Sequence, residues 1–145
     1  MKKVSLLFSL AVASLIFVSC KKEDAPSTPV DARDKFVGTW IGSYRTQIPT
    51  LSVDETSNDT TLITKSTTNS NQILVDSLPA NVSGNSYTYV QYSETFEDPT
   101  VGTVVYTLNG NGTLSGSNLV ETGTLNFLVQ GTSYPGTWSS NLVKQ

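Results

Sequence analysis

Residues able to carry catalytic chemistry are scarce in this chain of 145 residues. It has no histidine, and Cys20 is its single cysteine. Histidine is the commonest general base and the commonest metal ligand in proteins. Serines are plentiful, but none lies in the Gly-x-Ser-x-Gly pattern of a nucleophile elbow. We therefore predict that the protein is not an enzyme and that it holds no metal or cofactor.

Carboxylates are the remaining candidates for chemistry, and they fall into two groups. Paired carboxylates carry out glycoside hydrolysis, and regularly spaced oxygen ligands bind Ca²⁺. Neither group has the spacing of a calcium loop, and both lie in or near expected loops. We interpret them as solvated surface, with calcium binding and catalysis as the alternatives. The groups are Asp54, Glu55 and Asp59, and Glu94, Glu97 and Asp98.

The position of Cys20 indicates a different role for this residue. A basic start, residues 1–3, precedes an apolar run over 4–18, and Cys20 follows shortly after that run. The run is shorter than the ~20 residues that span a bilayer, and it has the form of the apolar region of a signal peptide. The segment resembles a type II (lipoprotein) signal peptide, in the loose form found in Bacteroidetes. The alternatives are a free thiol and a cysteine discarded with an ordinary secretory signal.

This resemblance implies a membrane anchor. Residues 1–19 would be removed, and Cys20 would carry the acyl chains that hold the protein in the outer membrane. Acidic residues just after the lipidated cysteine, here Glu23 and Asp24, can direct such proteins to the outer leaflet, so we expect display at the cell surface, with a periplasm-facing position as the alternative. Residues 20–35 are charged and nearly devoid of large apolar side chains, which predicts a flexible tether. A short helix over 29–35 is the alternative.

The charge of the chain excludes one class of partner. The formal net charge is −3, and from residue 36 onward only Arg45, Lys65 and Lys144 are basic. Because binding of nucleic acid requires clustered cations, we exclude it. The expected partners are the membrane, through the anchor, and a small ligand or glycan. We expect the protein to be a monomer.

Residues 36–145 have the pattern of one all-β domain. Thr, Val, Tyr and Ile recur with a period of two, which is typical of strands. Asn, Ser and Gly mark the turns; the strongest hairpin signal is Asn-Gly-Asn-Gly at 109–112, with further reversals at 83–86 and 131–133. Residues 49–60 are predicted to form a long mobile loop. The predicted strands are 38–47, 61–66, 72–77, 87–96, 103–109, 113–120, 123–130 and 136–142.

Both tryptophans occur in the same tripeptide, Gly-Thr-Trp, near opposite ends of this domain. Trp40 and Trp138 have glycines on their own strand faces, which leaves room for a large ring inside a curved sheet. Gly38-Thr39-Trp40 resembles the lipocalin (calycin) signature, and residues 112–138 are similar to small lipocalin-like lipoproteins of Bacteroidetes. We predict an antiparallel up-and-down barrel of about eight strands, in which the first and last strands pair and the two tryptophans share one core. A β-sandwich is the alternative.

The fold and the aromatic residues predict a binding protein. We expect a non-catalytic barrel that binds a small apolar or amphiphilic ligand. The alternative is a protein- or glycan-interaction module, such as an accessory subunit or inhibitor, with no internal ligand. The aromatic side chains can also be explained by core packing alone. The candidate ligand-binding residues are Trp40, Tyr44, Tyr87, Tyr89 and Trp138.

Two short motifs suggest covalent modification. Asp-Thr-Thr and Asp-Ser-Leu resemble the O-glycosylation acceptors of exported Bacteroidetes proteins. The acceptor residues would be Thr60 and Ser77.

Overall fold

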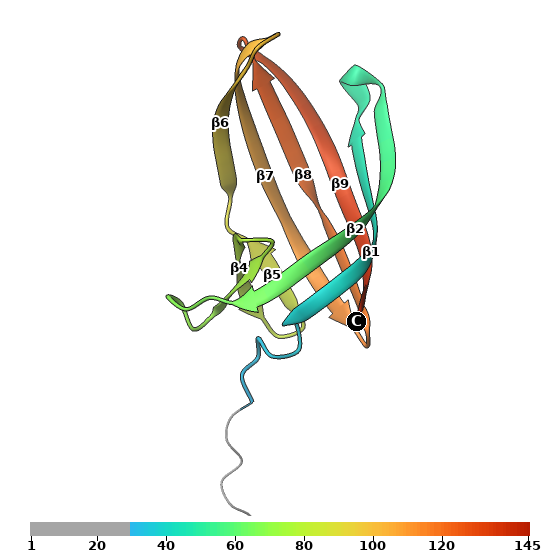
Figure 1. The fold of residues 1–145 in the computed structure, drawn as a ribbon, viewed down its shortest axis with the longest axis vertical. Coiled ribbons are helices and arrows are strands. Elements are labelled where there is room, and N and C mark those ends of the chain that lie inside the picture. The colour runs from blue at the N-terminus through green and yellow to red at the C-terminus, as the bar shows by residue number, and fades with distance from the viewer. Residues whose placement is uncertain (1–29) are drawn as a thin grey trace, which may run out of the picture.

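The computed structural model describes residues 30–145, which form one all-β domain (Figure 1). The predicted signal peptide and Cys20 lie outside the described residues. The strands are all antiparallel to their neighbours. Their bounds are β1 Gly38–Ile48, β2 Val53–Lys65, β3 Gln72–Val75, β4 Leu78–Ser83, β5 Ser86–Tyr89, β6 Tyr92–Asp98, β7 Gly102–Ser115, β8 Asn118–Val129 and β9 Thr132–Lys144.

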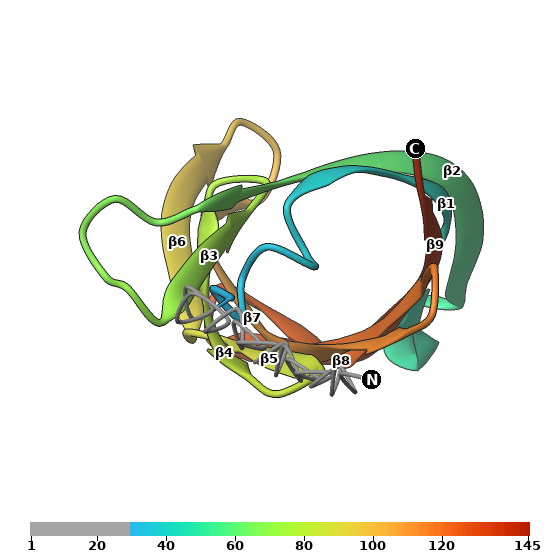
Figure 2. The same ribbon diagram turned by 90° about the horizontal axis from the view of Figure 1, so that it is seen from below.

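Pairing of the strands closes a ring. The sheet runs in the order β5-β4-β3-β2-β1-β9-β8-β7-β6, and β5 also pairs with β7. Pairing of β1 with β9 joins the first and last strands of the domain, as predicted. Seen from below, the strands surround a central space, and the chain ahead of β1 turns into it (Figure 2). The prediction of an up-and-down, barrel-like sheet is confirmed, with nine strands instead of about eight, and the β-sandwich alternative is wrong.

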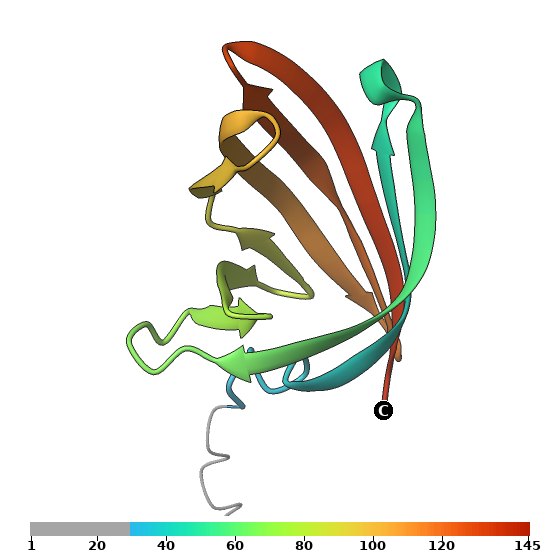
Figure 3. The same cartoon turned by 45° about the horizontal axis from the view of Figure 1, so that its top comes forward.

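The ring is closed at only one end of the domain. The lower end in Figure 1 is where β1 begins and where β5 meets β7. Towards the upper end, residues 53–62 of β2 pair with β1 alone, and β6 pairs with β7 alone. Figure 3 shows the β1–β2 hairpin and β6 standing apart on the two sides of this opening. The domain is therefore a barrel below and an open, curved sheet above.

Apolar side chains fill the closed lower half. Phe36 and Trp40 are fully buried there, and the Trp40 indole Nε1 donates a hydrogen bond of 2.7 Å to the Phe36 carbonyl oxygen. This bond satisfies the one polar atom of a large buried ring. The other fully buried large side chains are Ile63, Ile73, Tyr87, Leu119 and Leu142.

The prediction of a hairpin turn at 109–112 is wrong, because these residues lie inside β7. The two glycines instead leave space for aromatic rings. A Cβ added to Gly110 would lie 2.4 Å from the Trp138 ring, and one added to Gly112 would lie 2.3 Å from the Tyr87 ring. Both distances are far below contact, so a glycine is required at each position. Local turn chemistry is overridden here by packing against distant parts of the chain.

Several other predicted boundaries are also wrong. Residues 49–60 are not a long loop: a single turn, Pro49–Leu51, leads into β2, whose residues 53–62 pair along β1. The predicted strand 113–120 contains the turn between β7 and β8, and the predicted strand 87–96 is interrupted after Tyr89. The reversals expected near 83–86 and 131–133 are confirmed, as β4–β5 and β8–β9 turns.

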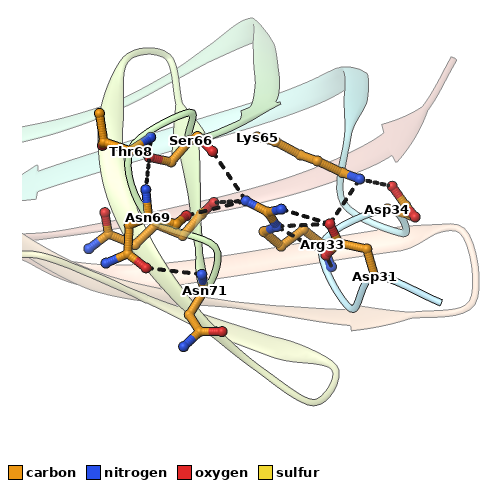
Figure 4. Close-up of polar contacts among 9 residues, drawn as sticks. Asp31, Arg33, Asp34, Lys65, Ser66, Thr68, Asn69 and Asn71 are labelled. Carbon is orange, nitrogen blue, oxygen red and sulfur yellow. Dashed lines mark hydrogen bonds and ion pairs between the residues drawn. The ribbon is translucent and has the colours of Figure 1, made fainter. Parts of the chain in front are cut away.

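The last residues of the predicted tether contact the domain. Residues 32–36 form turns, and not a helix. The Arg33 guanidinium donates through Nη1 to the carbonyl oxygens of Ser66, Asn69 and Gln72, at 3.2, 3.2 and 3.4 Å (Figure 4). It also pairs with Asp31 at 2.7 Å. These contacts hold the entry of the chain against the loop between β2 and β3, so contacts of the domain begin before the predicted boundary at residue 36.

Candidate functional site

A carboxylate is buried in the middle of the barrel wall. Glu121 on β8 is only 3% exposed. Its Oε1 accepts hydrogen bonds from the hydroxyls of Tyr87 and Tyr89, the latter at 2.6 Å, and its Oε2 accepts one from Ser140 at 2.5 Å. None of the ion pairs among the described residues involves Glu121. Three neutral hydroxyls, and no cation, surround this charge.

Strand register explains how these side chains meet. Tyr87 pairs with Gly112, Gly112 with Glu121, and Glu121 with Ser140, so the four residues form one row across β5, β7, β8 and β9. Inward side chains in such a row lie side by side. Because Gly112 has no side chain, the Tyr87 ring reaches over it to Glu121. The glycine of the mispredicted turn is thus part of the structure that positions the site.

The environment keeps both phenols protonated. Burial raises the pKa of Tyr87 and of Tyr89, and the adjacent negative charge of Glu121 raises both further. Each phenol therefore stays a hydrogen-bond donor at all pH values near neutrality. The carboxylate is held by fixed donors on two other strands.

A small cavity of about 120 Å³ opens beside Glu121, and we call it the Glu121 cavity. Its aromatic wall is continuous: Tyr44 stacks on Trp138 with ring centroids 5.8 Å apart, and Tyr89 meets Trp138 edge-on at 5.7 Å. Asp59 and Asp76, both more exposed than Glu121, also line it. The site combines aromatic faces with three carboxylates.

Two larger cavities adjoin each other in the open upper half. Their volumes are about 460 and 470 Å³, and both are lined by Ile48, Phe96 and Phe127. Tyr44 lines one of these two cavities and also the Glu121 cavity. The Glu121 cavity therefore lies at the inner end of the two larger cavities. We call the two larger cavities together the apolar groove. Further apolar residues along the groove are Leu51, Val53, Val101, Val104, Leu125 and Val129.

Charges are separated along the barrel. Near the lower end lie Arg33, Lys35, Lys65 and Lys144; Lys65 pairs with Asp31 and Asp34, and Lys144 lies over the Trp40 ring. The only other basic residue of the described part, Arg45, pairs with Asp54 and is half exposed. The acids of the middle and upper parts are Asp54, Glu55, Asp59, Asp76, Glu94, Glu97, Asp98 and Glu121.

The five candidate ligand-binding residues fall into two groups, one at the Glu121 cavity and one in the lower core. Tyr44, Tyr89 and Trp138 line the Glu121 cavity. Trp40 and Tyr87 are fully buried in the lower core and line none of the three cavities described above. The two tryptophans lie on paired strands at different levels: Trp40 opposite Lys144, and Trp138 opposite Thr46. Both belong to one hydrophobic core, as predicted, and Trp138 also lines the Glu121 cavity.

The tyrosines of β5 do not form an exposed binding surface. Tyr87 and Tyr89 point inward, and their rings meet edge-on at 5.6 Å. Tyr92 packs on the same side of the sheet, against Tyr106, because the break after Tyr89 resets the alternation.

The two acidic groups lie on β2 and β6, the edge strands beside the opening. Asp59 lines the Glu121 cavity, and Glu55 and Asp98 line the apolar groove. These three are therefore not only solvated surface. Among the described residues, no three His, Cys, Asp or Glu side chains gather as metal ligands would.

Glu121 was missed in the sequence, although a signal was present. Leu119, Glu121, Gly123 and Leu125 share one strand face, so a carboxylate interrupts an otherwise apolar, inward-facing row. The proposed acceptors Thr60 and Ser77 are both exposed, Thr60 on β2 and Ser77 in the turn between β3 and β4.

No helix among the described residues is long and apolar enough to cross a bilayer. No protein-family model matches the chain, and no curated protein matches it significantly.

Proposed function

We propose that this protein is a membrane-anchored lipoprotein whose half-open barrel binds a small amphiphilic ligand. The observation that carries the proposal is the apolar groove: its two parts, of about 460 and 470 Å³, have the size of ligand pockets in proteins, ~300–1,000 Å³. The lower half of the same barrel is filled with side chains. Apolar surface left open in one half only is an expected feature of a binding protein.

The proposed anchor agrees with the direction in which the groove opens. The chain enters the domain at the lower end in Figure 1, ahead of β1, and the groove is lined by residues from the parts of the strands towards the other end. A lipid on Cys20 would thus place the basic lower end towards the membrane and the groove away from it. Lys35 and Lys144, which take part in none of the ion pairs among the described residues, would favour an anionic membrane surface. The ligand would then enter from the aqueous side, at the cell surface or in the periplasm.

Binding of a neutral apolar probe tests the groove. N-phenyl-1-naphthylamine gains fluorescence in apolar surroundings, and we expect saturable binding by the chain from Lys21 onward. This chain omits Cys20 but keeps the whole domain, whose core lies within 36–142. Phe127→Ser should weaken binding by about tenfold, because the side chain contributes ~1.5–3 kcal/mol of apolar contact.

Leu128 supplies the matched control, since it is the next residue on β8 and is 38% exposed. Leu128→Ser should leave binding unchanged. If both variants bind like the wild-type chain, or if the wild-type chain does not bind the probe, the proposed function is wrong.

A second candidate is the interaction module, and one observation favours it. Residues 53–62 of β2 pair on one side only, so an extended peptide could add to the sheet there. A partner bound in this way would slow hydrogen exchange of the free β2 amides. A ligand in the groove would instead change the surroundings of Phe96 and Phe127.

A further inference from the structure

We propose that the Glu121 cavity binds a positively charged headgroup, of the ammonium or alkylammonium class, whose apolar tail lies in the apolar groove. This inference rests on the proposed function, because the groove supplies the place for the tail. It identifies the ligand class as a cationic amphiphile.

The buried carboxylate is the first reason. A buried carboxylate is costly unless a positive charge or several hydrogen bonds compensate it. Glu121 has three neutral donors, and Oε2 accepts from Ser140 alone among the described residues. Each carboxylate oxygen has two lone pairs, so Oε2 can accept one more hydrogen bond. An ammonium N–H in the cavity would supply both the bond and the missing charge, and a quaternary ammonium would supply the charge alone.

The aromatic wall is the second reason. A cation is attracted to the face of Trp or Tyr within ~6 Å of the ring centroid. Trp138 and Tyr44 stack with 25° between their planes, and both line the cavity beside Glu121. Its volume of about 120 Å³ is the share of about four water molecules. That space suits a headgroup and excludes the tail.

The surrounding charges are the third reason. Asp59 and Asp76 line the same cavity, and Glu55 and Asp98 line the adjoining groove. No basic side chain lines any of the three cavities. Walls of one sign focus the field inside a cleft and raise the local concentration of the opposite charge. The pKa of Tyr44 is raised first by burial and further by Glu121 and Asp59, in keeping with a negative potential there.

A set of three probes with the same ten-carbon chain separates charge from apolar contact. Decyltrimethylammonium, decanol and decanoate are titrated below their aggregation limits into the chain from Lys21 onward, and heats of binding are recorded. We expect the cation to bind about tenfold more tightly than decanol and decanoate to bind least, as the carboxylate and ring contacts require. Added salt should reduce the preference for the cation.

Glu121→Gln tests the carboxylate, and Asp59→Asn tests the cavity in case the first variant does not fold. Either change should lower affinity for decyltrimethylammonium several-fold and leave decanol binding unchanged. Glu97→Gln is the matched control: it removes the same charge from β6, where Glu97 is exposed and accepts a hydrogen bond from Thr103. This variant should bind all three probes like the wild-type chain.

The outcomes distinguish the two proposals. If decanol binds and the cation binds no more tightly, or if Asp59→Asn and Glu121→Gln change nothing, the inference about charge is overturned while the groove remains. If no probe binds, the proposed function fails, and the inference fails with it.

Discussion

Tyr89 donates a hydrogen bond of 2.6 Å to Glu121 from β5 to β8, two strands that β7 separates. The Tyr87 hydroxyl donates to the same carboxylate oxygen. The two bonds together connect β5, which closes the ring, to β8 on the far side of β7. It also fixes the carboxylate beside the Glu121 cavity. The closed lower half and the candidate site therefore share one polar group.

Removal of this carboxylate should destabilise the domain. Glu121→Ala leaves three buried or partly buried hydroxyls without their acceptor, and we expect a loss of about 3 kcal/mol in the free energy of unfolding. Glu121→Gln should cost less, because the amide oxygen still accepts hydrogen bonds. Urea denaturation followed by tryptophan fluorescence measures both. An alanine variant as stable as the wild-type chain would show that the bonds at Glu121 contribute nothing net.

Alanine at Gly112 should also destabilise the domain. The new Cβ would lie 2.3 Å from the Tyr87 ring, and overpacking of this kind costs ~1–3 kcal/mol. Gly116 is the matched control, since it lies in the β7–β8 turn with φ of 60° and no atom within 4 Å of an added Cβ. Gly116→Ala should cost about 1 kcal/mol, through backbone strain alone. A loss at Gly112 no larger than that at Gly116 would contradict the packing of the Tyr87 ring on Gly112.

The Gly-Thr-Trp repeat and the glycines at 110 and 112 show what the sequence could and could not predict. The Gly-Thr-Trp repeat and the period-two pattern were enough to predict an antiparallel ring in which the first and last strands pair. The glycines at 110 and 112 were misassigned because their cause is non-local: they accommodate rings that arrive from β5 and β9. No window around Asn-Gly-Asn-Gly contains that information.

The open half explains the other failures. Strand β2 looked like a loop because its upper part has solvent on one face and an open cavity on the other, so few apolar residues are needed. Of the candidate site, Tyr44, Tyr89 and Trp138 were predicted from residue type and strand face. Glu121 was visible as a charge in an inward row, but its contact with Tyr87 depends on register through Gly112.

Acid should weaken the attachment of the N-terminal turn. The Arg33 guanidinium holds the pKa of Asp31 far below its usual range, and Lys65 lowers it further. A depressed folded-state pKa contributes stability above the unfolded-state value, about 3.9 for Asp, and this contribution is lost as the pH falls below it.

The comparison of wild type with Asp31→Asn measures this contribution. The wild-type chain should be the more stable at neutral pH, and the difference should shrink as the pH is lowered from about 5 to about 2. A difference that stays constant over this range would mean that ionisation of Asp31 does not support the turn.

The proposed anchor makes its own prediction. Cys20→Ala should abolish incorporation of labelled fatty acid and leave a longer, unprocessed chain. Cys20→Ala protein that still labels and stays at the membrane would place the anchor elsewhere. Replacement of Glu23 and Asp24 with Ala should keep the labelling but reduce access of protease to the protein on intact cells, if these residues direct export.

The two tryptophans provide the most direct test of ligand binding in the open half of the barrel. Trp138 lines the Glu121 cavity and donates through Nε1 to the Asn109 carbonyl oxygen at 3.1 Å, whereas Trp40 is fully buried in the lower core. In ¹⁵N-labelled protein each indole N–H gives one NMR signal, and Trp138→Phe assigns the pair. Titration with decyltrimethylammonium should shift the Trp138 signal saturably and leave the Trp40 signal in place. A Trp138 signal that does not move, or equal movement of both signals, would contradict the account.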